Sequence, residues 1–211
     1  MKKYITEFIG TFILIFCGTG ACAVNEITSG TITHVGIAIT WGLVVMAIIY
    51  ALGEKSGAHI NPAVTIAFAV NKNFPARQVA PYIISQVAGA LSASLVLKLL
   101  FPTSVLLGAT LPAGSEVQSF VMEFILTFIL MLVVINVAKG SKEQGLFAGI
   151  AIGSVVLFEA MFAGPVSGAS MNPARSLAPA IVSGNMEHIW IYIIAPIAGA
   201  ITAIFIHKII K

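Results

Sequence analysis

Six long apolar segments, separated by short polar stretches, set the pattern of hydrophobic and polar positions along this chain. Each has 19 to 23 residues, close to the roughly 20 apolar residues with which a helix crosses a bilayer. Strands of a membrane barrel would alternate apolar and polar side chains, and these segments do not. The pattern therefore predicts an all-α integral membrane protein with six transmembrane helices, at Ile5–Val24, His34–Leu52, Gln78–Leu100, Val117–Ala138, Gly145–Ala163 and His188–Ile206.

Two shorter apolar segments, Pro62–Val70 and Pro173–Val182, follow the second and the fifth long segments. They have 9 and 10 residues, so as helices they would be about 14 and 15 Å long at ~1.5 Å per residue. Each would cover about half of a ~30 Å hydrocarbon core. We predict two re-entrant half-helices that meet tip to tip and together complete one further span.

Both short segments begin inside related decapeptides. Ser56–Thr65 has the sequence SGAHINPAVT, and Ser167–Ser176 has the sequence SGASMNPARS. Asn is a preferred N-cap residue because its side-chain oxygen accepts an unpaired amide of the first helical turn. Pro fits the first helical position, where its missing N–H costs nothing. The motifs Asn61-Pro62-Ala63 and Asn172-Pro173-Ala174 therefore predict two helix starts.

The meeting of these two starts suggests a pore. Each helix N-terminus carries roughly half a positive charge, and the amide groups of Asn61 and Asn172 remain as donors if their oxygens serve as caps. Such a point repels cations and orients a passing water or hydroxyl as an acceptor. The alternative is that both motifs are caps of ordinary core helices, but two copies in matching context favour the pore.

The chain is also an internal repeat, which we interpret as one channel domain, 1–211, with inverted halves at approximately 1–100 and 117–211. Each half holds three long segments, an odd number, so the halves cross the membrane in opposite directions. Inverted repeats with interrupted helices are typical of a permeation site at the membrane midplane. Matching segments are Glu7–Leu14 with Glu123–Leu130, Gly36–Ile39 with Gly149–Ile152, and Ala88–Ala90 with Ala198–Ala200.

Composition and charge agree with a membrane protein and give it an orientation. The chain is 58% hydrophobic and 9% charged, whereas soluble domains have about 25% charged residues. The net charge of +3 comes from short flanking segments without a basic face, which argues against nucleic-acid binding. By the positive-inside rule, both termini are cytoplasmic, because one side collects Lys2, Lys3, Lys55, Lys72, Arg77, the charged turn Lys139–Gln144, Lys208 and Lys211.

The chain resembles the aquaporin, or major intrinsic protein, family over essentially its whole length. The paired Asn-Pro-Ala motifs, the repeat and the segment MFAGPVSGASMNPARSLAPAI are most similar to the nodulin-26-like, aquaglyceroporin-type branch and its prokaryotic relatives. This resemblance implies a plasma-membrane homotetramer whose monomers each pass water or small uncharged solutes down their gradients. It implies no cofactor, no bound metal and no enzymatic activity.

Arg175 lies three residues after Asn172 and so shares its face of the half-helix. A lone Arg within a membrane is costly and is by default functional; a salt bridge to Glu187 near the surface is the alternative. The resemblance places Arg175 in a selectivity filter with Trp41, Ala160 and Ala169. A filter with one apolar wall, one polar wall and two alanines favours glycerol, with urea or neutral metalloid acids as further solutes. Ser176 directly follows Arg175, and a Ser in this place is found in the family's water channels. It favours the alternative of strict water selectivity.

Several other polar residues lie within the apolar segments. By resemblance, Glu7 and Glu123 hold the re-entrant loops by accepting backbone amides. His59 could offer its carbonyl to the pore or act in a pH gate, and a packed ring is the simpler reading. Glu159 could tune the filter, pair with a neighbouring chain or face the tetramer axis. A coupled secondary transporter using Glu159, Glu7 or Glu123 as an ion site is a third class of function.

Overall fold

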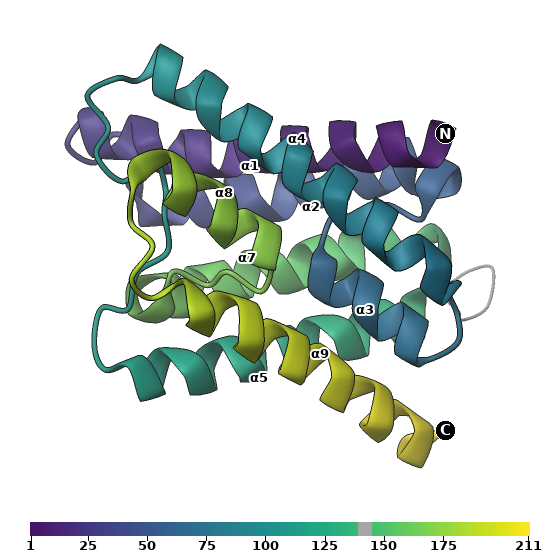
Figure 1. Cartoon of the computed structure of the whole chain (residues 1–211). Helices are drawn as coiled ribbons and strands as arrows, with labels where there is room; N and C mark the ends of the chain where they lie inside the picture. Colours follow the sequence, from purple (N-terminus) through teal and green to yellow (C-terminus); the bar gives the residue numbers. More distant parts are fainter. Residues whose placement is uncertain (139–144) are drawn as a thin grey trace.

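The computed structural model describes residues 1–138 and 145–211, and in these ranges it is helical and contains no strand. The six helices long and apolar enough to cross a membrane confirm the predicted all-α membrane architecture (Figure 1). The turn predicted at Lys139–Gln144 lies outside the described residues. The long helices are α1 (Lys2–Ile27), α2 (Thr33–Ser56), α4 (Val79–Leu100, after the 3-10 turn η1, Ala76–Gln78), α5 (Glu116–Val137), α7 (Ala148–Ser167) and α9 (Ile189–Ile210).

The observed helices extend beyond the predicted ones at several ends. Helix α1 runs on to Ile27, α2 to Ser56 and α9 to Ile210. The apolar pattern marks only the part of a helix that lies in hydrocarbon, whereas helices continue into the polar headgroup region. Helix α7, in contrast, begins later than the predicted span. Phe147 interrupts the helical geometry, so the helix begins at Ala148 and not at Gly145.

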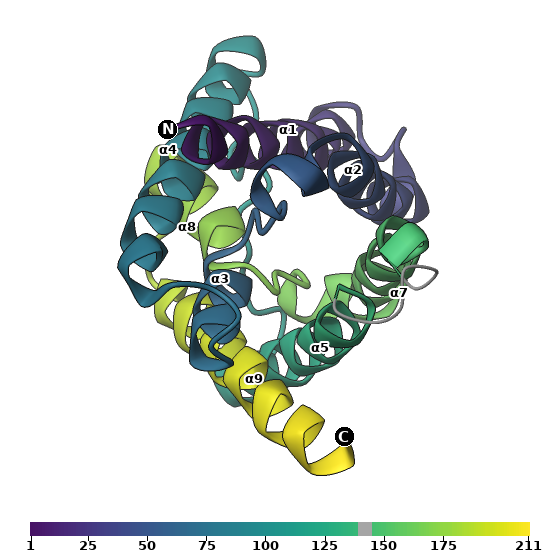
Figure 2. The same ribbon diagram turned by 90° about the vertical axis from the view of Figure 1, so that its right-hand side faces the viewer.

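Two short helices, α3 (Pro62–Val70) and α8 (Pro173–Ser183), lie inside the ring of long helices (Figure 2). Helix α3 lies toward the end of the molecule that carries both chain termini, and α8 lies toward the opposite end (Figure 1). The N-terminal ends of the two helices point toward each other at the centre. This is the arrangement of half-helices that the decapeptides predict.

Matching glycines let the long helices pack in equivalent pairs, α1 with α4 and α5 with α9. A Cβ atom added to Gly89 would lie 2.2 Å from the Phe8 carbonyl oxygen, and one added to Gly199 would lie 2.1 Å from the Phe124 carbonyl oxygen. Only glycine therefore allows this close approach of backbones, which is a common device in membrane helix packing. The same contact in both halves supports the division of the chain into two related repeats.

The outer surface and the interior of the bundle differ in polarity. Ile5, Ile9 and Ile13 of α1 are exposed on the outside, whereas Glu7 and Thr11 of the same helix are fully buried. Large exposed apolar side chains occur on every long helix, as expected where the surrounding solvent is lipid. The protein is therefore a multi-pass membrane protein with its polar groups gathered around the central half-helices.

Candidate pore and selectivity filter

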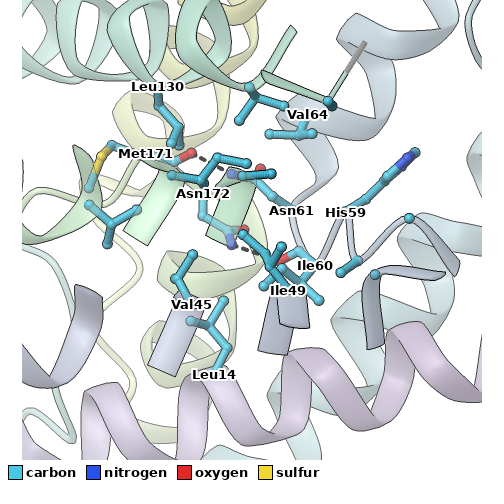
Figure 3. Close-up of a pocket in the computed structure, with 18 of the residues that line it drawn as sticks. Leu14, Val45, Ile49, His59, Ile60, Asn61, Val64, Leu130, Met171 and Asn172 are labelled. Atoms are coloured by element: carbon cyan, nitrogen blue, oxygen red, sulfur yellow. Dashed lines mark hydrogen bonds between the residues drawn. The ribbon is translucent and has the colours of Figure 1, made fainter. Parts of the chain in front are cut away.

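Asn61 and Asn172 cap their half-helices and also bind the opposite loop (Figure 3). The Asn61 oxygen accepts the Ala63 amide at 2.9 Å, and the Asn172 oxygen accepts the Ala174 amide at 3.0 Å. The Asn61 amide group then donates to the Met171 carbonyl at 2.8 Å, and the Asn172 amide group donates to the Ile60 carbonyl at 2.9 Å. These reciprocal bonds fasten the two half-helices to each other.

The reciprocal bonds correct one expectation drawn from the sequence. Both amide groups were expected to remain free for passing solutes, but each one uses a hydrogen on the opposite loop. An amide NH₂ group carries two hydrogens, so one donor on each Asn is left. The half-helix junction therefore holds two Asn donors, and the bonds made by their other hydrogens fix both side chains in place.

The loops before the half-helices have the same unusual backbone in both halves. Ala58 and Ile60 have φ of 44° and 43°, and the equivalent Ala169 and Met171 have φ of 42° and 55°. Left-handed conformations of residues other than glycine cost of order 1–3 kcal/mol each and persist only where the surroundings impose them. In each loop, residues with positive φ alternate with residues of ordinary φ. This backbone turns the Ile60 and Met171 carbonyls toward the opposite half-helix, where the Asn side chains bind them.

Two fully buried carboxylates hold these strained loops. Glu7 accepts the amides of His59 at 3.0 Å and Ile60 at 2.7 Å. Glu123 accepts the amides of Ser170 and Met171, both at 2.8 Å. Each also accepts a serine hydroxyl at 2.7 Å, from Ser56 or Ser167. Both glutamates thus accept the backbone amides of a re-entrant loop, which is the role that the resemblance implies.

A cavity of about 440 Å³ runs along the half-helix junction, from Arg175 to Tyr50 and Glu54 near the end that carries the chain termini. Its lining is asymmetric. The two asparagines, the loop residues and Arg175 form a polar stripe, and the rest is largely apolar. Figure 3 shows this apolar wall, whose residues include Leu14, Val45, Ile49, Val64 and Leu130.

Arg175 and Trp41 meet at one end of this cavity. The guanidinium carbon lies 4.7 Å from the centre of the Trp41 ring, within the ~6 Å range of a cation–π contact. The guanidinium also donates to the Gly108 carbonyl at 2.6 Å, while its Nε has no hydrogen-bond partner among the described residues. Arg175 is 4% exposed and Trp41 is 7% exposed. Both side chains therefore face the interior of the monomer.

These positions decide the alternative that the sequence left for Arg175. The alternative salt bridge to Glu187 is not formed: within the described part of the chain Arg175 has no carboxylate within 4 Å, and Glu187 lies near His188. Trp41 does not face the lipid. Its ring packs so closely on α1 that a Cβ atom on Gly18 would lie 2.3 Å from it. Gly18 therefore makes the space in which the indole stands beside Arg175.

The two small residues assigned to the filter are buried in different surroundings. Ala169 lines the cavity next to Arg175. Ala160 is buried on α7 but is not part of the cavity lining, and Val156, one turn away, is. The structure therefore places Ala169, but not Ala160, in the lining of this cavity.

A chain of hydroxyl groups supports the loop beside Arg175. Thr110 donates to Ser176 at 2.7 Å, Ser176 and Ser170 are 2.5 Å apart, and Ser170 donates to the Asn172 carbonyl at 3.0 Å. Ser176 is fully buried. Its hydroxyl is thus used in holding loops together and does not line the cavity.

His59 and Glu159 are both inside the monomer. The His59 ring lies 4.9 Å from the rings of Phe68 and Phe74, and Figure 3 shows it pointing away from the paired asparagines. His59 also belongs to the cavity lining, so its ring is packed against aromatic side chains at the cavity wall. Glu159 is fully buried and neither oxygen has a hydrogen-bond partner in the described structure. It therefore does not reach the outer surface, where a neighbouring chain or a tetramer axis would lie.

Sequence reasoning missed the backbone groups of the site. The Gly108 carbonyl binds Arg175, and the carbonyls of Ile60 and Met171 bind the asparagines. Carbonyls are common to every residue type, so no side-chain pattern marks them. The two prolines and two glycines of 101–115 are typical of an irregular segment, but they do not mark which carbonyl binds Arg175.

Comparison with known proteins agrees with this geometry. The model of the family described as "Major intrinsic protein" matches residues 1–207. The chain is 49% identical to aquaporin NIP1-1 of Oryza sativa subsp. japonica over 212 aligned residues. The alignment covers all of this chain and 75% of the relative. It is 48% identical to nodulin-26 of Glycine max, of which it covers 78%. The X-ray structure of the aquaglyceroporin from Plasmodium falciparum superimposes with a TM-score of 0.89 at 27% identity, covering 99% of this chain and 96% of that one.

The fold and the paired half-helices define a membrane channel. The chain belongs to the major intrinsic protein family, and its similarity to nodulin-26 and the NIP aquaporins extends over its full length. This is a family of channels, and the similarity agrees with the resemblance found in the sequence.

Proposed function

We propose that this protein is a passive channel for water and small neutral solutes, with glycerol-like polyols as the preferred solute class. The observation that carries the proposal is the pairing of Arg175 with Trp41, 4.7 Å apart. A polyol has hydroxyls along one side and carbon along the other. The guanidinium and nearby carbonyls meet its hydroxyls, and the indole meets its carbon chain.

Exclusion of ions follows from charge and geometry in this proposal. The N-termini of α3 and α8 bring two positive dipole ends to the midpoint of the pore, and Arg175 adds a fixed positive charge at one end. Donors at Asn61 and Asn172 orient a passing oxygen as an acceptor. A cation therefore meets repulsion at two points, and a chain of waters is interrupted at the asparagines.

The filter residues proposed here are Trp41, Ala160, Ala169 and Arg175, with the two Asn-Pro-Ala motifs as the central constriction. Strict water selectivity is the second candidate, and Ser176 is the residue that favours it. The burial of Ser176 in loop contacts makes it a weaker guide to solute size than the alanines. Coupled transport through Glu7 or Glu123 is disfavoured, because both carboxylates are engaged by loop amides.

The assembly and location are part of the same proposal. We propose a homotetramer in the plasma membrane, with both termini in the cytoplasm. The exposed apolar faces of the long helices offer area for contact with lipid and with other subunits. The basic residues on the side of the chain termini support the orientation.

Replacement of Ala160 by His tests the aperture. We expect glycerol permeability to fall by about tenfold or more, while water permeability stays within about twofold, because an imidazole fills the space that the methyl group leaves. The measurement is stopped-flow light scattering on proteoliposomes. Ala160→Ser, which adds one oxygen and little bulk, is the matched control and should behave as the wild type. Equal loss of both permeabilities, or loss of neither, would remove Ala160 from the filter.

A further inference from the structure

The loop that binds Arg175 is fastened at its other end by Glu26. This residue lies at the C-terminal end of α1 (Lys2–Ile27), and its carboxylate receives three hydrogen bonds from the segment 104–106. Ser104 donates its hydroxyl at 2.6 Å, and the backbone amides of Val105 and Leu106 donate at 2.8 and 3.4 Å. One carboxylate thus holds two backbone amides and a hydroxyl of a single turn.

The contacts continue from this turn to the filter. The Ser104 hydroxyl also accepts the Leu107 amide at 3.1 Å, and the Leu107 side chain is fully buried. Leu107 and Gly108 both have positive φ, 51° and 72°. A Cβ atom on Gly108 would lie 2.8 Å from the Thr19 side chain, so the loop lies directly against α1. Its next contact is the bond from Arg175 to the Gly108 carbonyl.

This arrangement repeats the way in which the buried glutamates hold the re-entrant loops. Glu7 and Glu123 each accept two consecutive backbone amides and one serine hydroxyl. Glu26 accepts the same set from a third irregular segment. Hydrogen bonds to a charged acceptor are stronger than neutral ones, and the strained backbone at Leu107 needs a restraint on each side. Thr110, bound to Ser176, supplies the restraint on the other side.

We propose that Glu26 is a positioning residue of the selectivity filter. It fixes the turn 104–106, the turn sets the place of the Gly108 carbonyl, and that carbonyl sets the orientation of the Arg175 guanidinium across from Trp41. Glu26 touches no solute and acts through the loop. Without it the polar wall of the filter loses its fixed acceptor, and the guanidinium gains freedom to move into the pore.

Glu26 is exposed, and exposed ion pairs contribute little to stability. The three bonds of Glu26, however, are hydrogen bonds from uncharged groups of one loop. Their expected effect is therefore on the conformation of the loop and on solute selectivity, more than on the folding of the six-helix bundle.

The test compares Glu26→Ala with Glu26→Gln and with Glu187→Ala, the removal of another exposed carboxylate that holds no loop amide. Hydrogen exchange of the peptide 101–110 in the reconstituted protein reports on the loop. The ratio of glycerol to water permeability, which does not depend on the amount of active protein, reports on the filter.

We expect Glu26→Ala to raise the exchange rate in 101–110 by about tenfold, a change equivalent to the loss of about one charge-assisted hydrogen bond. We expect the same variant to lower the permeability ratio about fivefold. Glu26→Gln keeps a carbonyl oxygen for the two amides but loses the charge and the oxygen that accepts the Ser104 hydroxyl, so it should be intermediate. Glu187→Ala should stay within about twofold of the wild type.

The permeability ratio rests on the proposed function, whereas hydrogen exchange does not. If wild-type protein passes water but no glycerol, the proposed solute class fails, and the exchange experiment still decides whether Glu26 holds the loop.

If exchange in 101–110 is unchanged in Glu26→Ala, the positioning role is wrong. An exchange increase with an unchanged ratio would show that Glu26 holds the loop without setting the filter, and would overturn the proposal as well. Equal changes in Glu26→Ala and Glu26→Gln would assign the effect to charge and contradict the hydrogen-bond argument.

Discussion

Replacement of Arg175 by Val should leave water permeability within about twofold of the wild type and raise the flux of protons and small cations by at least about tenfold. The guanidinium is the fixed cation of the pore, and a unit charge at about 4 Å contributes roughly 4 kcal/mol at an effective dielectric constant near 20. Its removal also leaves the Gly108 carbonyl without its donor. The filter would then lose a positive charge and gain an unpaired acceptor, and both changes favour cations.

The measurement is proton flux into proteoliposomes loaded with a pH-sensitive dye, with water permeability measured on the same preparation. Arg175→Lys is the matched control, because it keeps the charge and loses the planar group that donates to Gly108 and stacks on Trp41. It should retain most of the exclusion. Unchanged proton and cation exclusion in Arg175→Val would mean that the half-helix junction alone excludes charge.

Replacement of Glu123 by Ala should destabilise the protein and abolish its permeability. The carboxylate is fully buried and receives the amides of Ser170 and Met171 and the hydroxyl of Ser167. Without it, two buried amides are left unpaired in a loop whose backbone is already strained at Ala169 and Met171. Unpaired buried groups cost about 1–3 kcal/mol each, and lost bonds to a charged group have similar values, so the total is about 3–6 kcal/mol.

Heating in detergent followed by size-exclusion chromatography measures the loss of folded protein, and stopped-flow light scattering measures its permeability. Glu123→Gln keeps one oxygen for the loop amides and should be intermediate in both. Glu187→Ala removes an exposed carboxylate and serves as the control that should change neither. Wild-type stability and permeability in Glu123→Ala would show that the loop holds its shape without the carboxylate.

The elements of the fold could be predicted from the sequence because each depends on local pattern. Apolar length marks the six spans, and Asn61-Pro62 and Asn172-Pro173 mark two helix starts by their capping chemistry. Glu7 and Glu123 occupy matching positions in the two halves of the repeat, which indicated that both have the same kind of surroundings. The ends of the helices could not be predicted closely, because hydropathy marks the hydrocarbon region and not the end of the hydrogen-bonded helix.

The site could be predicted only in part. Arg175 was marked by the cost of a lone charge in a membrane, but Trp41, Ala160 and Ala169 required the resemblance to a known family. The bond between Asn61 and Met171 joins residues 110 positions apart, and no local pattern specifies it. The Gly108 carbonyl belongs to a loop whose shape depends on contacts with α8 and with α1, which carries Glu26. The roles of this carbonyl and of the Glu26 carboxylate therefore became evident only in three dimensions.

The most direct test of the account is the comparison of water and glycerol permeability of wild-type protein in proteoliposomes by stopped-flow light scattering. The filter formed by Trp41, Arg175 and the two alanines predicts that both permeate well above the level of empty liposomes. Fast water permeation with glycerol at background would contradict the proposed solute class, and would show that the filter selects strictly for water.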